Sequence, residues 1–258
     1  MDFLSKYFKY ENGITIAGLT KELNIFYVLD LFKKENKNIL ILTNTLYEAN
    51  TYFDLIHTYT DDVCLFPMDD FLTSVAVAVS PDLKIKRLET LDVIRNKSKK
   101  IVVTNLMGYL RYLPNKNDTS NLEFTLSLKN NVKREEILEM LEKYGYIRES
   151  IVTTTGEYAV RGYIIDLFII EEEHPIRIEF FGDDIESIRY FDENTQLSIN
   201  EIDKIMIKPY TEVVCEVHSS LVDYMNNPLV VMVNRDQIEL AYNKLLHDIE
   251  EYNENENI

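Results

Sequence analysis

The chain has 258 residues, 44 of them acidic against 27 basic, which gives a formal net charge of -17 at pH 7. A phosphate backbone repels a chain this acidic unless its basic residues are clustered, and no such cluster is visible in the sequence. Direct nucleic-acid binding by this chain alone is therefore disfavoured, and a basic protein surface is the more natural partner.

Length, cysteines and the N-terminus place the chain among ordinary cytoplasmic proteins of one large or two modest domains. Cys64 and Cys215 stand in apolar contexts that are typical of reduced thiols rather than of a disulfide. The first residues lack the pattern of a signal peptide, and no apolar run approaches membrane-spanning length. The acidic end, 248–258, is typical of a frayed terminus or the edge of a larger protein.

Residues 13–112 alternate short apolar runs with amphipathic ones. Four continuous, β-branched runs are typical of strands buried on both faces: 14–17, 39–43, 63–66 and 101–104. Three longer segments between them have helical periodicity: 20–34, 46–59 and 82–97. This order predicts a parallel α/β layer over residues 1–114.

A polar loop with a proline, 112–121, precedes a different pattern. Over 121–208 we expect a smaller α+β domain in which the helix 132–146 packs on an antiparallel meander. The predicted strands are 122–127, 148–154, 157–168, 175–181, 185–191 and 202–208. In the return segment 209–258, the run 229–233 and the helix 236–252 indicate that the first layer resumes. The second domain is thus predicted to be inserted into the first.

The first candidate for chemistry is a P-loop, which needs G-x-x-x-x-G-K-[ST] between a strand and a helix. In one register, 13-GITIAGLT-20, Leu19 occupies the lysine position. In the other, 18-GLTKELNI-25, the second glycine, the lysine and the hydroxyl are all missing. We interpret the segment as a vestigial P-loop near Gly18, Thr20 and Lys21, in which Gly18 makes a tight bend and no nucleotide cofactor binds.

Other catalytic or metal constellations are absent from the sequence. The four histidines lack metal-ligand spacing, no Cys-x-x-Cys pair exists, and no G-x-S-x-G or Cys/His arrangement indicates a nucleophile. We therefore expect no catalytic residues and no metal site.

The meander carries the stronger candidates. In 175-PIRIEFF-181 the strand period places Arg177 and Phe181 on one face and the isoleucines on the other, the latter toward the helix 133–144. In 157–168, read as one strand, Arg161 shares a face with Tyr163, and Gly162 would allow close packing or a bulge. Exposed arginine with aromatics is the composition of a protein-protein hot spot. The pattern alone favours the alternative, a cross-strand ion pair with a neighbouring acid.

The run 156-GEYAVRGYIIDLF-168, continued by 175-PIRIEFFGDDIESIRYFDENTQLSI-199, closely resembles the N-terminal UvrB-homology region of the bacterial transcription-repair coupling factor (Mfd) family. The order of upstream segments agrees: a strand-GLT-helix start, 66-FPMDD-70, 87-RLETL-91 and 101-IVVTNLMGYLRYLP-114. UvrB is similar in the meander, but it keeps an intact P-loop and carries a tyrosine-rich β-hairpin. Neither feature stands in this sequence.

The resemblance implies a non-catalytic adaptor region of a longer protein, with a degenerate α/β domain and an inserted domain that recruits UvrA for nucleotide excision repair. The family's UvrA-contacting residues fall on Arg161, Arg177 and Phe181. Tyr163 and Ile169 depart from the family pattern beside this patch. The resemblance also implies that the longer protein binds its own C-terminal domain, RNA polymerase and DNA through other regions, one of which is an ATP-dependent DNA translocase.

Two other functions stay open. The chain could be a nucleotide- and DNA-binding helicase domain of UvrB type, or an architectural clamp that holds a motor inactive.

Overall fold

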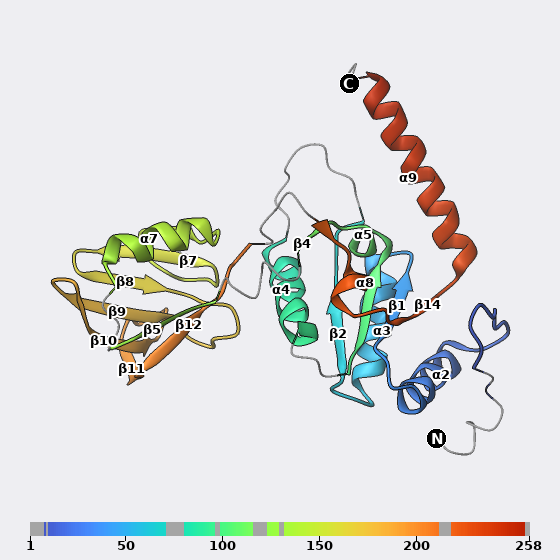
Figure 1. Ribbon diagram of the computed structural model, residues 1–258, viewed down its shortest axis with the longest axis horizontal. Coiled ribbons are helices and arrows are strands. Elements are labelled where there is room, and N and C mark those ends of the chain that lie inside the picture. The colour runs from blue at the N-terminus through green and yellow to red at the C-terminus, as the bar shows by residue number, and fades with distance from the viewer. Residues whose placement is uncertain are drawn as a thin grey trace. The chain divides into compact units, whose positions relative to one another are not determined.

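The computed structural model describes residues 8, 10–70, 80–95, 99–115, 123–128, 132–211 and 218–255, with side chains up to residue 252 (Figure 1). The chain divides into two compact units. Unit 1 comprises Met1–Arg111 and Ser220–Ile258, and unit 2 comprises Tyr112–Ser219. Among the helices of the described residues, none is long and apolar enough to cross a membrane. Cys215 lies outside the described residues.

Unit 1 is built on a four-stranded parallel sheet with the order β14-β1-β3-β2. Its strands are β1 (Ile39–Thr43), β2 (Val63–Phe66), β3 (Ile101–Asn105) and β14 (Leu229–Met232). Its helices are α2 (Lys21–Lys34), α3 (Leu46–His57), α4 (Pro81–Arg95), α5 (Leu106–Tyr109), α8 (Leu221–Tyr224) and α9 (Arg235–Asn255). The parallel α/β layer is therefore confirmed, and 229–233 does return to it as β14.

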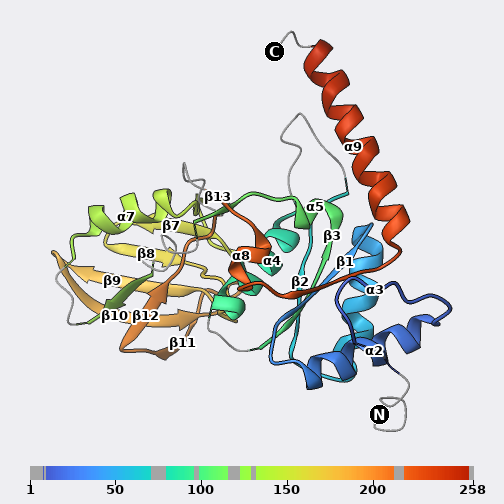
Figure 2. The ribbon, with the colours of Figure 1, turned by 45° about the vertical axis from the view of Figure 1, so that its right-hand side comes forward.

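The sheet of unit 1 is buried because β1 and β3 consist of apolar and β-branched residues that are covered on both faces. Ile39 and Ile41 pack with α2 and α3 in the main hydrophobic cluster. Leu42, on the opposite face, packs with α5 and the first turns of α9. Figure 2 shows α2 and α3 together beside β1, while the rest of α9 extends away from the sheet.

The expected strand at 14–17 is wrong. The segment forms no strand, and Ile14 and Ile16 are exposed. The chain just before it packs on α2 instead: the Tyr10 ring stacks on Tyr27 with ring centroids 5.3 Å apart. Aromatic packing on the helix therefore decides the course of this segment, although its β-branched residues favour a strand.

Unit 2 contains a six-stranded sheet with the order β11-β10-β9-β8-β7-β6, antiparallel except for the β6–β7 pair. Its strands are β6 (Ile147–Arg148), β7 (Glu157–Arg161), β8 (Ile164–Leu167), β9 (Ile176–Phe181), β10 (Asp184–Phe191) and β11 (Ser198–Glu201). Two short pairs accompany it: β5 (Phe124–Ser127) with β12 (Lys204–Ile207), and β4 (Leu113–Pro114) with β13 (His218–Ser219).

Helix α7 (Arg134–Lys143) lies over one face of this sheet (Figure 1). Tyr158 of β7 donates a hydrogen bond from its hydroxyl to Glu142 of α7 at 3.2 Å. Tyr158 shares its face with Ile176 and Ile178, which are fully buried. The expected packing of a helix on the isoleucine face is confirmed, and the opposite face carries the polar side chains described next.

Candidate functional site

The run 157–168, predicted as one strand, is two strands joined by a tight turn. Arg161 at the end of β7 pairs with Ile164 at the start of β8, so only Gly162 and Tyr163 lie between them. Gly162 has φ +60°, and a glycine at the first central position is the mark of a type II′ hairpin turn. A Cβ atom there would meet nothing within 4 Å. The expected close packing or bulge at Gly162 is therefore wrong: the glycine serves the backbone of a turn.

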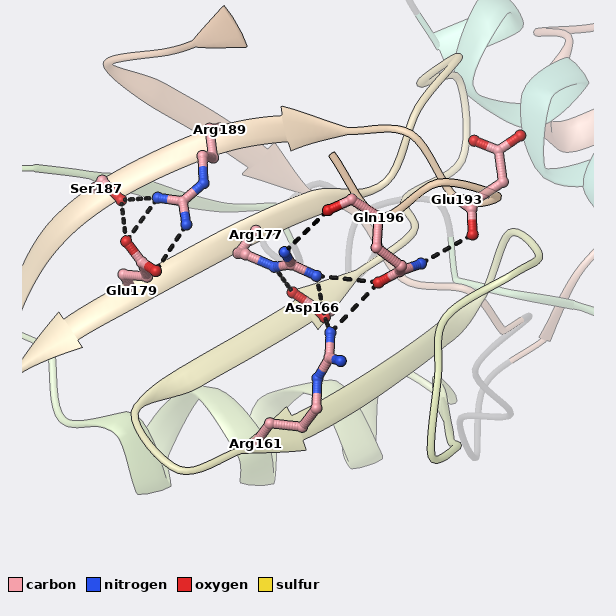
Figure 3. A network of polar contacts seen from close by, with 8 residues as sticks. All are labelled: Arg161, Asp166, Arg177, Glu179, Ser187, Arg189, Glu193 and Gln196. Atoms are coloured by element: carbon pink, nitrogen blue, oxygen red, sulfur yellow. Dashed lines mark hydrogen bonds and ion pairs between the residues drawn. The ribbon is translucent and has the colours of Figure 1, made fainter. Parts of the chain in front are cut away.

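A buried carboxylate lies at the centre of the polar sheet face (Figure 3). Asp166 of β8 is 1% exposed and lies in register with Arg177 of β9. Arg177 donates to both of its oxygens, from Nε to Oδ1 at 2.7 Å and from Nη2 to Oδ2 at 3.0 Å. Arg161 donates from Nη2 to the same Oδ2. The structure thus brings the two predicted arginines together on one carboxylate.

Two further residues complete this network. The Oε1 atom of Gln196 accepts from Nη2 of Arg177 at 3.1 Å and from Nη2 of Arg161 at 3.4 Å. The backbone oxygen of Gln196 accepts from Nη1 of Arg177 at 3.4 Å. Phe191 lies on the same face, its ring centroid 4.3 Å from Cζ of Arg177, which is cation–π distance. We call Arg161, Asp166, Arg177, Phe191 and Gln196 the arginine cluster.

The three predicted contact residues differ in accessibility. Phe181, at the end of β9, is 77% exposed. The side chain of Arg161 is 45% exposed, whereas that of Arg177 is only 12% exposed. Tyr163 in the hairpin turn is 66% exposed, and its backbone oxygen accepts from the amide of Phe180 at 2.9 Å, which anchors the turn beside Phe181. Ile169 is buried and therefore contributes to the core rather than to this surface.

A second ion pair occupies the same sheet face but does not join the arginine cluster. Glu179 accepts from Nη1 and Nη2 of Arg189 at 2.6 Å each, and from the hydroxyl of Ser187 at 3.1 Å. The hydrogen bonds from Arg189 hold the pKa of Glu179 below its usual value, against the opposing effect of burial. The pair stabilises the β9–β10 strand pair and, in Figure 3, lies apart from Asp166.

The vestigial P-loop residues lie in unit 1 and do not join this cluster. Gly18 has φ +81° and precedes α2. Thr20 is the N-cap of α2, and its hydroxyl accepts from the amide of Leu23 at 3.4 Å. Lys21 is the first residue of the helix and is exposed. Among the described residues there is also no group of three histidines, cysteines or carboxylates placed to hold a metal ion.

Sequence reasoning did not single out Asp166, Phe191 and Gln196. The acid in D-L-F follows the hairpin by only a few residues, and a two-residue turn at Gly162 would have placed it beside Arg161. Phe191 comes from the end of β10, which pairs with β9, and Gln196 comes from the turn that follows β10, so neither is near the arginines in sequence.

Comparison with known proteins identifies relatives over both units. A family described as the UvrB interaction domain matches residues 124–212. The transcription-repair-coupling factor of Bacillus subtilis (strain 168) is 27% identical over 247 residues, which is 93% of this chain and 21% of that protein. The corresponding protein of Staphylococcus haemolyticus (strain JCSC1435) is 31% identical over 79% of this chain and 18% of its own length. In Staphylococcus aureus (strain bovine RF122 / ET3-1) the identity is 28% over 88% of this chain and 19% of the relative.

The chain spans about a fifth of the length of these curated relatives. Residues 124–212 contain α7 and the whole six-stranded sheet, and therefore the arginine cluster and Phe181. The chain belongs to the transcription-repair-coupling factor family over the region that it shares with these relatives, and residues 124–212 form its UvrB interaction domain.

Proposed function

We propose that this chain is a non-catalytic adaptor of transcription-coupled repair, acting in the cytoplasm, and that unit 2 recruits UvrA through Arg161, Arg177 and Phe181. The observation that carries the proposal is the convergence of two arginines on one buried carboxylate, on a sheet face whose end exposes a phenylalanine. Arginine and aromatic residues dominate the binding energy of protein interfaces.

The charge of the surroundings supports a specific rather than a general attraction. The chain is strongly acidic, yet the arginine cluster places two guanidinium groups against one carboxylate. Contacts of this kind select a partner by geometry. The net negative charge of the chain repels acidic proteins in general, so charge alone does not attract an acidic partner.

The sharpest test uses residues whose loss leaves the fold intact. Phe181→Ala removes a side chain that is 77% exposed, so the thermal unfolding temperature should stay the same. Titration calorimetry on the whole chain should show that the variant binds UvrA more weakly. The loss of binding free energy should be about 2 kcal/mol or more if Phe181 is a hot spot. Ile147→Ala is the matched control, because Ile147 is an exposed apolar residue on β6, the edge strand of the same sheet that lies three strands from β9. Equal affinities of the wild type and of Phe181→Ala would refute the assignment.

We propose no enzymatic activity for this chain. Two residues support this. Thr20 caps α2, and Leu19 stands at the lysine position of the P-loop register 13-GITIAGLT-20. Calorimetric titration with ATP and Mg²⁺ tests this, since detectable binding would favour a UvrB-type nucleotide-binding domain instead. By the same resemblance, we propose that contacts with RNA polymerase, DNA and a C-terminal domain belong to other regions of a longer protein.

A further inference from the structure

The buried position of Asp166 is energetically unfavourable for a carboxylate. A buried carboxylate costs several kcal/mol in desolvation, and an apolar side chain of similar size is commonly at least as stabilising. Asp166 is nevertheless 1% exposed. Its strand lies between β7 and β9, and the residues that these two strands bury on the α7 side are apolar. Its oxygens accept three hydrogen bonds, all from arginines of neighbouring strands. Stability of the sheet alone does not account for this arrangement.

The cluster treats its two arginines differently. All three guanidinium nitrogens of Arg177 are engaged, by Asp166 and Gln196, and its Cζ atom lies over the Phe191 ring. Arg161 is held through Nη2 alone. Its Nε and Nη1 donate to no acceptor within the described ranges, and its side chain is 45% exposed. Arg177 therefore helps to fix the acid, while Arg161 is oriented by the acid and keeps donors for another molecule.

The conformation of Gln196 is fixed by the turn that contains it. Gln196 has φ +62°, in the left-handed region, and its amide donates to the backbone oxygen of Asp192 at 2.7 Å. The carboxylate of Asp192 accepts from the amides of Asn194 and Thr195 at 3.2 and 2.6 Å, which closes the turn. The Gln196 side chain is further tied by a 2.8 Å bond from Nε2 to the backbone oxygen of Glu193. This turn holds the acceptor in place before any partner arrives.

We propose that Asp166, with Gln196, is the positioning residue of the docking surface: it holds the guanidinium groups of Arg161 and Arg177 in their binding orientation and touches no partner itself. The inference rests on the proposed function, because it concerns the surface assigned to UvrA. Ordering two flexible side chains in the free protein removes an entropic cost that binding would otherwise carry.

Asp166→Asn is the primary test, because asparagine keeps the shape and one acceptor but loses the charge. The affinity of the whole chain for UvrA should fall about tenfold or more, as two arginine side chains lose their fixed orientation. Bulk charge predicts the opposite for an acidic partner surface, since the variant leaves the arginines less neutralised. Glu179→Gln makes the same change of charge on the same sheet face and should bind as the wild type does. Equal or tighter binding by a folded Asp166→Asn would overturn the proposal.

A second variant keeps the test decisive if Asp166→Asn does not fold. Gln196→Gly removes the side-chain acceptor at a position whose φ of +62° glycine adopts without strain. It should lower the affinity about threefold or more, because both arginines lose a shared acceptor.

A double-mutant cycle with Arg161→Ala separates the positioning role of Asp166 from a purely structural one. In the Arg161→Ala background, Asp166→Asn should weaken binding much less than in the wild type, and an unchanged effect would contradict action through Arg161.

A readout without UvrA separates this inference from the proposed function. Relaxation of the ¹⁵N nucleus at Nε reports how ordered each arginine side chain is in the free chain. Both Arg161 and Arg177 should be ordered in the wild type and become mobile in Asp166→Asn, and unchanged order would overturn the positioning role. If the wild type does not bind UvrA but the arginines lose order as expected, the proposed function fails and the orienting role of Asp166 stands.

Discussion

The free energy of unfolding of the six-stranded sheet should depend far more on Arg177 than on Arg161, although both bond the same carboxylate. Arg177→Met removes the bidentate partner of Asp166 and keeps a flexible chain over Phe191. Loss of one partner of a buried ion pair costs about 3–5 kcal/mol. Because Arg161 remains bonded to Asp166, we expect a cost just below this range, about 2–3 kcal/mol.

Arg161→Met leaves the bidentate pair intact. The side chain of Arg161 is 45% exposed against 12% for Arg177, so its own ion pair is largely screened by water. Exposed pairs contribute about 0–1 kcal/mol, and that is the expected cost of Arg161→Met. Both variants change the net charge by the same amount, so long-range repulsion within the acidic chain affects them equally.

Native-state hydrogen exchange, read by mass spectrometry on peptides from β8 and β9, measures this difference within unit 2 of the whole chain. It needs no two-state unfolding of both units together. Peptides from β1 and β3 of unit 1 serve as internal references and should be unchanged. An equal or larger effect of Arg161→Met would refute the assignment of Arg177 as the holding residue of Asp166.

Four further predictions test the surroundings of the cluster. Gly182→Ala, at φ +65° in open space, should cost about 1–2 kcal/mol in unfolding free energy. Gly156→Ala should cost about 1–3 kcal/mol more than Gly182→Ala, both measured by urea denaturation, because its Cβ atom would lie 2.2 Å from the ring of Tyr210. Glu179 has a folded pKa below its ordinary 4.5, chiefly through Arg189, so its contribution to stability is present above pH 4.5 and is lost as the pH falls through the folded pKa. Glu179→Gln should therefore show a flatter acid limb of stability against pH. Burial, with the nearby Glu172 carboxylate, raises the pKa of Tyr190 from 10 to about 12, so stability should decline from pH 10 toward pH 12, and less so in Tyr190→Phe.

The parallel layer of unit 1 was predictable where burial and periodicity agree. β1, β2 and β3 are continuous apolar runs, and each lies where the sequence predicts it. The run 14–17 is also apolar and β-branched but forms no strand, and nearby Tyr10 stacks on Tyr27 of α2. Composition reports that a segment is able to form a strand, whereas the tertiary contacts decide whether it does.

The candidate site was predictable in part. Strand period correctly separates Arg177 and Phe181 from the buried isoleucines, because β9 is one regular strand. The pattern's cross-strand ion pair is also present, with Asp166 as the acid. An ion pair and a partner contact are compatible here, since Arg161 is bonded through one nitrogen and exposed through the others. The strand pattern of a single residue cannot show that one arginine takes part in both an ion pair and a partner contact.

Asp166 was missed for a reason of parity. In one continuous strand, residues 161 and 166 point to opposite faces, since their separation is odd. The two-residue turn at Gly162 sets Arg161 opposite Ile164, and Asp166 follows two residues later on the same face. A glycine in the middle of an apolar run is thus the signal that decides which acid an arginine meets. Lengthening this turn by one residue would shift the β7–β8 register and part Arg161 from Asp166, while the β8–β9 pairing still holds Asp166 beside Arg177. Such an insertion should weaken UvrA binding even though every contact residue is still present.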